Sequence, residues 1–184
     1  MGRASINPMG SGARMSVIST LKPGPSKPVV LAPIEVRPTG CGFGVFALDT
    51  IRAGECILLF ERRFIDAPTT ITLRVDEDLH QISTDPRAAE NFVNHSCDPS
   101  ALIEWSDLSL VAKREILPGE QVTYDYMTSD WDGEDPFHCQ CGAEQCRESI
   151  RGFRHLTLAQ QEKVRHLASP YIQKMSAGLL SKDC

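Results

Sequence analysis

From Ile34 onward, short apolar stretches alternate with turn-forming residues, a pattern typical of short β-strands. Cys56–Phe60 and Gln121–Tyr126 are two such stretches, each bounded by Gly, Pro or Asp. Further strands are predicted at 44–47, 71–75, 101–105 and 108–112, and a tight turn at Ser106-Asp107 would join the last two. One short helix is predicted at 86–93, where Pro suits a first helical position. The pattern favours a mainly β fold over alternating strand–helix units.

The periodicity becomes helical near the C-terminus. Apolar residues recur at helical spacing from Leu158 to Leu167, with Thr157 as the expected N-cap and Pro170 as the expected end. We expect four segments along the chain. They are a flexible tail at 1–33 (of which 1–14 is interpreted as an expression scar), a folded body at 34–132, a cysteine-rich segment at 133–150 and a C-terminal helical extension at 151–184.

Charge is distributed unevenly along the chain. Residues 1–34 carry four basic and no acidic side chains, so the remaining 150 residues carry −9 of the net charge of −5. An acidic body argues against a nucleic-acid binder, which needs a basic face. It suits a basic peptide partner, although an acidic solvated surface has the same composition.

Hydropathy indicates a soluble, intracellular protein. The longest strongly apolar run, Cys56–Phe60, is far shorter than the roughly 20 residues needed to span a bilayer. We therefore expect no membrane partner and a cytoplasmic or nuclear location. Import into an organelle stays open, because the N-terminal segment has basic and Ser residues but no acid.

Three of the seven cysteines lie within eight residues, in a Cys-x-Cys-x4-Cys pattern. In an intracellular chain this clustering indicates metal binding before disulfides. Cys139, Cys141 and Cys146 would supply three thiolates, and a structural zinc site needs four ligands. Cys97 is a better candidate for the fourth than His138, whose neighbour Cys139 would compete for the same ion. The alternative interpretation is three incidental thiols.

Three other motifs are weak when each is taken alone. Asn94-His95-Ser96-Cys97 contains groups used in nucleophilic catalysis, but the partners are too close in sequence for a Cys–His pair. Tyr124-Asp125-Tyr126 would place both phenols on one face of a strand, which is also an ordinary half-buried arrangement. Gly42-Phe43-Gly44 lacks the third glycine of a dinucleotide-binding loop, although its backbone could still approach a ligand closely.

The order of these motifs is specific even though each one is weak. Gly-x-Gly-Val-Phe-Ala is followed by Asn-His-Ser-Cys-x-Pro, then by Pro-Gly-Glu, Thr-Tyr-Asp-Tyr and Cys-x-Cys-Gly-x3-Cys. From about Gly40 to Cys146 the chain resembles a SET domain with a post-SET zinc segment, the protein-lysine methyltransferase family. The resemblance implies a mainly β SET-domain fold of small curved sheets with a pseudoknot, a zinc-bound post-SET loop and a C-terminal helical extension.

The resemblance also implies a role for each matching residue. Residues Gly42, Phe43 and Gly44 would contact S-adenosylmethionine through their backbone, and Asn94 and His95 would hold its polar groups. Tyr126 matches the catalytic tyrosine, and Tyr124 matches a position where tyrosine favours monomethylation. Structural zinc would be bound by Cys97, Cys139, Cys141 and Cys146. The implied acceptor is a lysine of a histone or of another protein.

The chain departs from the family mainly on the substrate side. Phe60 stands where a tyrosine hydroxyl often occurs, Asn91 replaces a common Arg, and Ser100 replaces a common Asn. The segment between Arg62 and Asn94 is also short. Two alternatives therefore stay open: an enzyme that uses the same cofactor on a small molecule or short peptide, and an inert SET-fold binding module. The oligomeric state is not indicated.

Overall fold

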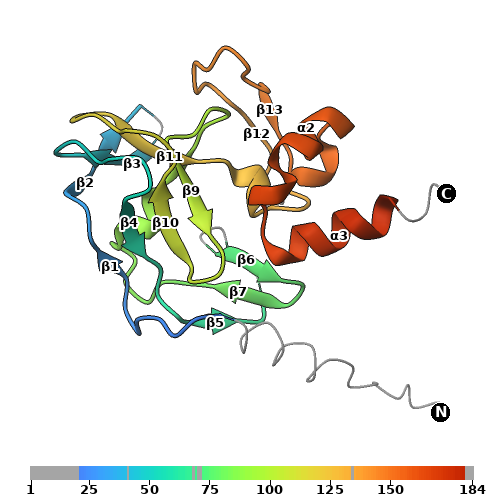
Figure 1. The fold of residues 1–184 in the computed structure, drawn as a ribbon, viewed down its shortest axis with the longest axis horizontal. Helices are drawn as coiled ribbons and strands as arrows, with labels where there is room; N and C mark the ends of the chain where they lie inside the picture. Colours follow the sequence, from blue (N-terminus) through green and yellow to red (C-terminus); the bar gives the residue numbers. More distant parts are fainter. Residues whose placement is uncertain (1–20, 41, 68, 70–71, 134, 181–184) are drawn as a thin grey trace.

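The computed structural model of the chain describes residues 21–40, 42–67, 69, 72–133 and 135–180, and its ribbon is shown in Figure 1. Two four-stranded sheets form the body. In the first, the antiparallel order is β1 (Val29–Val30), β4 (Cys56–Leu59), β10 (Ser109–Ala112) and β9 (Ala101–Glu104). In the second, the order is β2 (Ile34–Thr39), β3 (Gly42–Ala47), β11 (Gln121–Tyr124) and β8 (Asn94–His95), and its last pair is parallel.

Two smaller sheets and short helices complete the described fold. A three-stranded sheet has the order β5 (Phe64–Ile65), β7 (Leu79–Gln81) and β6 (Leu73–Asp76), and β12 (Phe137–His138) pairs with β13 (Ser149–Ile150). The 3₁₀ helices are η1 (Ala89–Phe92), η2 (Tyr126–Thr128), η3 (Phe153–His155) and η4 (Arg165–Leu167), and the α-helices are α2 (Leu158–Val164) and α3 (Pro170–Leu180). The expected mainly β fold of small sheets is confirmed.

The main core is built from the inward-facing residues of both large sheets. Val45, Ile57, Leu110 and Val122 are completely or almost completely buried, and they come from β3, β4, β10 and β11. Consecutive residues such as Ile57 and Leu58 are both buried, so these strands are covered on both faces and do not show a simple alternation of buried and exposed side chains. The core therefore fixes β11, whose C-terminal end leads directly into the tyrosine motif.

The C-terminal helices form a second, smaller core beside the sheets. Phe153 and Ile172 are fully buried, and they pack with Trp131 and Tyr171. Figure 1 shows α2 and α3 on one side of the molecule, with α3 near β6, and the two elements are in contact. Among the described residues, no helix is both long and apolar enough to cross a membrane.

The helical extension differs from its sequence-based prediction. Thr157 caps α2 through a reciprocal capping box with Gln160, as the sequence indicates. However, α2 ends at Val164, and Pro170 begins α3 instead of ending the helical region. Proline at a first helical position loses no hydrogen bond, because that N–H has no partner within the helix. The predicted helix at 86–93 is only the 3₁₀ turn η1.

Part of the expected tail is ordered against the body. Val29 and Val30 pair with Leu59 and Leu58 as strand β1, and Ala32 is buried. The prediction of a flexible tail is therefore wrong for residues 29–32, which backbone pairing and the burial of Ala32 hold against the body. Residues 1–20, including the interpreted expression scar at 1–14, lie outside the described residues.

Candidate active site

The parallel pair β8–β11 brings two distant motifs together. Asn94 lies opposite Thr123, and His95 lies opposite Tyr124. The Ser100 hydroxyl accepts a hydrogen bond from the Thr123 N–H at 3.0 Å, which holds the segment after β8 against β11. The Asn-His motif and the tyrosine motif are therefore neighbours, as the resemblance implied.

Tyr124 and Tyr126 lie side by side, but not for the reason expected from strand alternation. Strand β11 ends at Tyr124, and Tyr126 begins the 3₁₀ helix η2, whose N-cap is Asp125. The turn still brings the two rings to a centroid distance of 4.9 Å. The prediction of one strand through Tyr126 is wrong, because the Asp125 carboxylate accepts a hydrogen bond from Met127 N–H and starts a new turn.

Both phenols are held by hydrogen bonds and stay protonated at neutral pH. The Tyr126 hydroxyl donates to the Val93 carbonyl at 3.1 Å, and the Tyr124 hydroxyl lies 3.4 Å from Ser129 Oγ. Burial raises the pKa of Tyr126 to about 12. Burial raises the pKa of Tyr124 above its ordinary value as well. Each hydroxyl can therefore orient a polar group without ionising.

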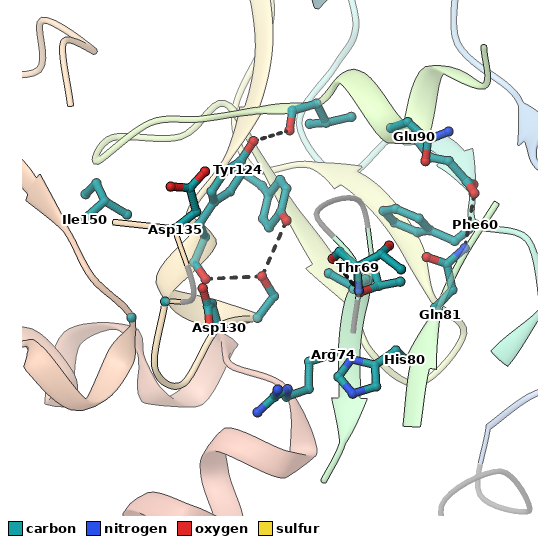
Figure 2. A pocket seen from close by; sticks show the side chains of 18 of the residues that line it. Phe60, Thr69, Arg74, His80, Gln81, Glu90, Tyr124, Asp130, Asp135 and Ile150 are labelled. Atoms are coloured by element: carbon teal, nitrogen blue, oxygen red, sulfur yellow. Dashed lines mark hydrogen bonds between the residues drawn. The ribbon is translucent and has the colours of Figure 1, made fainter. Parts of the chain in front are cut away.

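A cavity of about 320 Å³ lies against these two tyrosines. Figure 2 shows its wall from close by, with Tyr124 and Asp130 on one side and Phe60, Gln81 and Glu90 on the other. Phe60 and Phe137 give the wall aromatic surface, so Phe60 lines the cavity without a hydroxyl. A cavity of this volume falls at the lower end of the range for small-ligand sites.

The glycine-containing segment meets Asn94 at the start of β3. Asn94 Nδ2 donates to the Phe43 carbonyl at 2.8 Å, and the Phe43 side chain is 51% exposed. Gly42 has φ of +107°, a conformation that side-chain-bearing residues rarely adopt, and a Cβ there would meet no atom within 4 Å. Backbone beside open space fits a segment that approaches a ligand closely. The predicted cofactor residues Gly42, Phe43 and Asn94 are thus together.

His95 is buried in a different way from the other predicted cofactor residues. Its side chain is only 2% exposed. Its Nδ1 accepts a hydrogen bond from the Tyr126 N–H at 3.1 Å, and its Nε2 lies 3.3 Å from Cys97 Sγ. Burial and the nearby charge of Arg147 lower the pKa of His95 to about 3, so the imidazole is neutral. Both ring nitrogens are occupied, so His95 can offer a ligand only its backbone.

Four cysteines converge beside His95. The Sγ atoms of Cys97, Cys139, Cys141 and Cys146 all lie within 4.8 Å of one another. Tetrahedral zinc with Zn–S bonds of about 2.3 Å would place its sulfur ligands about 3.8 Å apart. Cys97 Sγ and Cys139 Sγ are 3.9 Å apart, and backbone N–H groups of Arg147 and Glu148 donate to Cys97 and Cys146. The donor set and its spacing fit a closed zinc site.

A buried ion pair ties the cysteine segment to the tyrosine turn. Arg147 Nη2 lies 2.7 Å from Asp125 Oδ1, and the two side chains are 9% and 7% exposed. Burial raises the pKa of Asp125, although Arg147 acts in the opposite direction. Asp125 caps η2 at Tyr126, and Arg147 directly follows Cys146. Through this ion pair, a movement of the cysteine segment would also move the turn that carries Tyr126.

Sequence analysis missed two residues of this region. Arg147 could have been noticed in the sequence, because it is a basic residue directly after Cys146 in an acidic body. Its pairing with Asp125 is visible only in the folded structure. Glu90 carried no signal, because an acidic residue in a short 3₁₀ turn is ordinarily exposed.

Comparison with known proteins agrees with this geometry. The family model described as SET domain matches residues 42–127. A protein of Caenorhabditis elegans named probable histone-lysine N-methyltransferase set-23 is 35% identical over 135 residues, which are 59% of this chain and 55% of that protein. The methyltransferase flvH of Aspergillus flavus is 28% identical over 89 residues, 47% of this chain and 49% of flvH. The chain spans about half the length of these two relatives.

Solved structures show the same fold. The crystal structure of KRYPTONITE in complex with mCHG DNA and SAH has a TM-score of 0.56 and 21% identity, covering 65% of this chain and 29% of that chain. The methyltransferase domain of human histone-lysine N-methyltransferase SETMAR has a TM-score of 0.51 and 19% identity, covering 67% and 59%. With the family match over residues 42–127 and the assembled motifs, these findings show that this part of the chain is a SET domain.

Proposed function

We propose that this protein transfers a methyl group from S-adenosylmethionine to the side-chain amine of a lysine in a protein. The observation that carries the proposal is the cavity against Tyr124 and Tyr126, together with the Phe43–Asn94 contact on β8, the strand that pairs with β11. Relatives named histone-lysine N-methyltransferases and a neighbour solved with SAH support the reaction and the cofactor. Histones and other lysine-bearing proteins are both candidate acceptors.

The roles of the residues follow from the chemistry of the acceptor. When bound, S-adenosylmethionine supplies an electrophilic methyl group, which a neutral amine must meet in line at about 3 to 3.5 Å. A lysine amine has a pKa of about 10.4, so deprotonation at pH 7 costs roughly 4 to 5 kcal/mol in water. Removal of water from the amine, together with the neighbouring positive charge of the cofactor, disfavours the ammonium form. Tyr126, with a pKa of about 12, orients the amine by its hydroxyl and stays protonated.

Cofactor and metal residues are assigned as part of the same proposal. Residues Gly42 to Gly44 and Asn94 would bind the cofactor, with His95 contributing through its backbone. The four-cysteine cluster would hold one structural zinc ion, which ties a post-SET segment at 133–150 to a SET domain at 34–132. The C-terminal extension at 151–184 would pack against both, as α3 packs on β6.

The first test measures transfer of isotope-labelled methyl groups from S-adenosylmethionine into cell extract. We expect label on macromolecules with the wild-type protein and about a hundredfold less with Tyr126→Phe, because misplacing a reacting group costs this much. Calorimetry should show unchanged cofactor affinity. Tyr171→Phe is the matched control, since Tyr171 lies on α3 in the second core and does not line the cavity. An equal loss of methyl transfer in both variants would contradict a catalytic role for Tyr126.

A second variant tests the role of Tyr124 in product choice. Tyr124→Phe removes the hydroxyl that lies 3.4 Å from Ser129 Oγ and leaves room beside the acceptor amine. We expect the product to shift from monomethyl-lysine towards di- and trimethyl-lysine, measured by mass spectrometry of an acceptor found in the first test. An unchanged product distribution would contradict this role.

Fractionation in the first test separates the alternatives. Label confined to small molecules would favour a small-molecule acceptor, for which Phe60 in place of a hydroxyl-bearing residue is the supporting observation. Cofactor binding without label in either fraction would favour an inert binding module. For a protein acceptor we propose an intracellular location, nuclear if the acceptor is a histone. No direct nucleic-acid contact is proposed for the acidic body.

A further inference from the structure

Glu90 is a cavity-wall carboxylate that the proposed reaction does not use. It lies on η1 and lines the same cavity as Phe60, Tyr124 and Tyr126. In Figure 2, Glu90 and Gln81 lie on the side of the cavity opposite Tyr124. A charge placed at Glu90 is therefore separated from an amine held at the tyrosines.

The protein fills only part of the hydrogen-bonding capacity of Glu90. Its Oε2 accepts from the Glu61 N–H at 3.1 Å, and its Oε1 accepts from Gln81 Nε2 at 3.1 Å. Gln81 is buried, and its amide also donates to the Glu61 carbonyl. The Ser83 side chain is a third hydrogen-bond partner of this carboxylate. An ionised carboxylate has about four acceptor sites, so these neutral donors fix the orientation of Glu90 and leave about one site for a group in the cavity.

Glu90 has no salt bridge with a basic side chain among the described residues, and its surroundings are acidic. Burial raises the pKa of Glu90, and the charge of Glu61 acts in the same direction. Asp130 and Asp135 line the same cavity, whereas its arginine, Arg74, lies over the ring of Tyr171. Glu90 is partly buried, and partial removal of water from a carboxylate without a counter-charge is unfavourable; a cation that reaches it from the cavity offsets this cost.

We propose that Glu90 is a specificity residue that binds a second cation of the substrate, a lysine or arginine side chain a few residues from the acceptor lysine. This inference rests on the proposed function. A fixed carboxylate opposite the tyrosines favours a substrate with one amine at Tyr126 and another positive charge across the cavity. Pairing with an ammonium or a guanidinium would use the acceptor capacity that the protein leaves unused.

The test uses labelled synthetic peptides with one central lysine and otherwise uncharged residues. A single arginine, or its neutral isostere citrulline, is placed at each position from −3 to +3 relative to the lysine. We expect the wild-type protein to bind the arginine peptide about tenfold more tightly than the citrulline peptide at one or two positions. Glu90→Gln should reduce that preference to less than about twofold. Binding is followed by fluorescence anisotropy and turnover by methyl transfer to the same peptides.

Two carboxylate variants serve as controls. Asp135→Asn changes another carboxylate of the same cavity, and Glu77→Gln changes an exposed one in the β6–β7 turn. Both should keep the tenfold preference for arginine. The melting temperature and the zinc content show whether each variant is folded. The comparison of arginine and citrulline peptides on the wild-type protein does not depend on any variant.

The outcomes separate this inference from the proposed function. A wild-type protein that binds arginine and citrulline peptides equally at every position would overturn the role of Glu90, as would a full preference retained by Glu90→Gln. Loss of the preference in Asp135→Asn alone would also overturn it. A Glu90-dependent preference in binding without any methyl transfer would support the assignment of Glu90 and count against the proposed reaction.

Discussion

Replacing Cys97 with serine should lower the bound zinc from about one equivalent towards zero. The substitution removes one of four thiolates whose sulfur atoms lie within 4.8 Å of one another, and serine is a poor zinc ligand by comparison. Metal content after purification, measured by atomic spectrometry, checks the prediction. Cys56→Ser is the matched control, because Cys56 is a partly buried free thiol on β4, outside the cluster.

Loss of the metal should also disturb the turn that carries Tyr126. Cys97 Sγ lies 3.3 Å from His95 Nε2, and His95 Nδ1 accepts from the Tyr126 N–H. We therefore expect the imidazole nitrogen resonances of His95 to shift in Cys97→Ser and in the chelator-treated wild type, but not in Cys56→Ser. A full equivalent of zinc in Cys97→Ser would rule out Cys97 as the fourth ligand.

The second large effect is expected at the buried pair of Asp125 and Arg147. Asp125→Asn keeps the size of the side chain and an oxygen that can accept from the Met127 N–H. However, it removes the carboxylate charge that pairs with Arg147 and leaves that guanidinium only Cys97 as a partner among the described residues. Removing one partner of a buried ion pair costs about 3 to 5 kcal/mol. We expect the free energy of unfolding in urea, at constant zinc concentration, to fall by about 3 kcal/mol.

An exposed ion pair in the same region provides the control. Asp132 pairs with Arg154 at 2.7 Å, but both side chains are about half exposed. Asp132→Asn should therefore lower the free energy of unfolding much less than Asp125→Asn does. Combining Asp125→Asn with Arg147→Met should recover part of the loss, because no buried charge is then left alone. Equal costs for Asp125→Asn and Asp132→Asn would contradict the importance of burial.

Much of the site could be predicted from the sequence, because its motifs are local. Each motif is a run of neighbouring residues that can be recognised without knowledge of the fold: Gly42-Phe43-Gly44, Asn94-His95 and the tyrosine motif. Their order along the chain indicated the family. The cysteine spacing limited the metal ligands to three residues, with Cys97 as the best fourth, and the four sulfur atoms do converge. Six strands were predicted at the right places from apolar runs and turn residues, with small errors at their ends, whereas β2 and several two- or three-residue strands were not predicted.

Other expectations failed because packing or capping decided the outcome. The sequence pattern predicted that Pro170 ends the helical region, but Pro170 begins α3. The contacts of α3 with β6 and with the second core favour this new helix. Residues 21–33 have tail composition, yet Val29 and Val30 pair with β4. The sequence pattern predicted that a strand continues to Tyr126, but Asp125 caps the 3₁₀ helix η2 at that point. In each case the deciding partner lies elsewhere in the chain or is a local hydrogen bond that competes with the strand.

The sequence by itself determined the fold class, the family resemblance and the residue types available for chemistry, because periodicity and short motifs depend only on residues that are neighbours in the chain. Only the tertiary structure decided how those residues act. It placed the His95 imidazole between Cys97 and Tyr126, paired Asp125 with Arg147 and left Glu90 on the cavity wall without a basic partner among the described residues. Burial and counter-charges depend on contacts between distant segments, and these contacts exist only after the chain has folded.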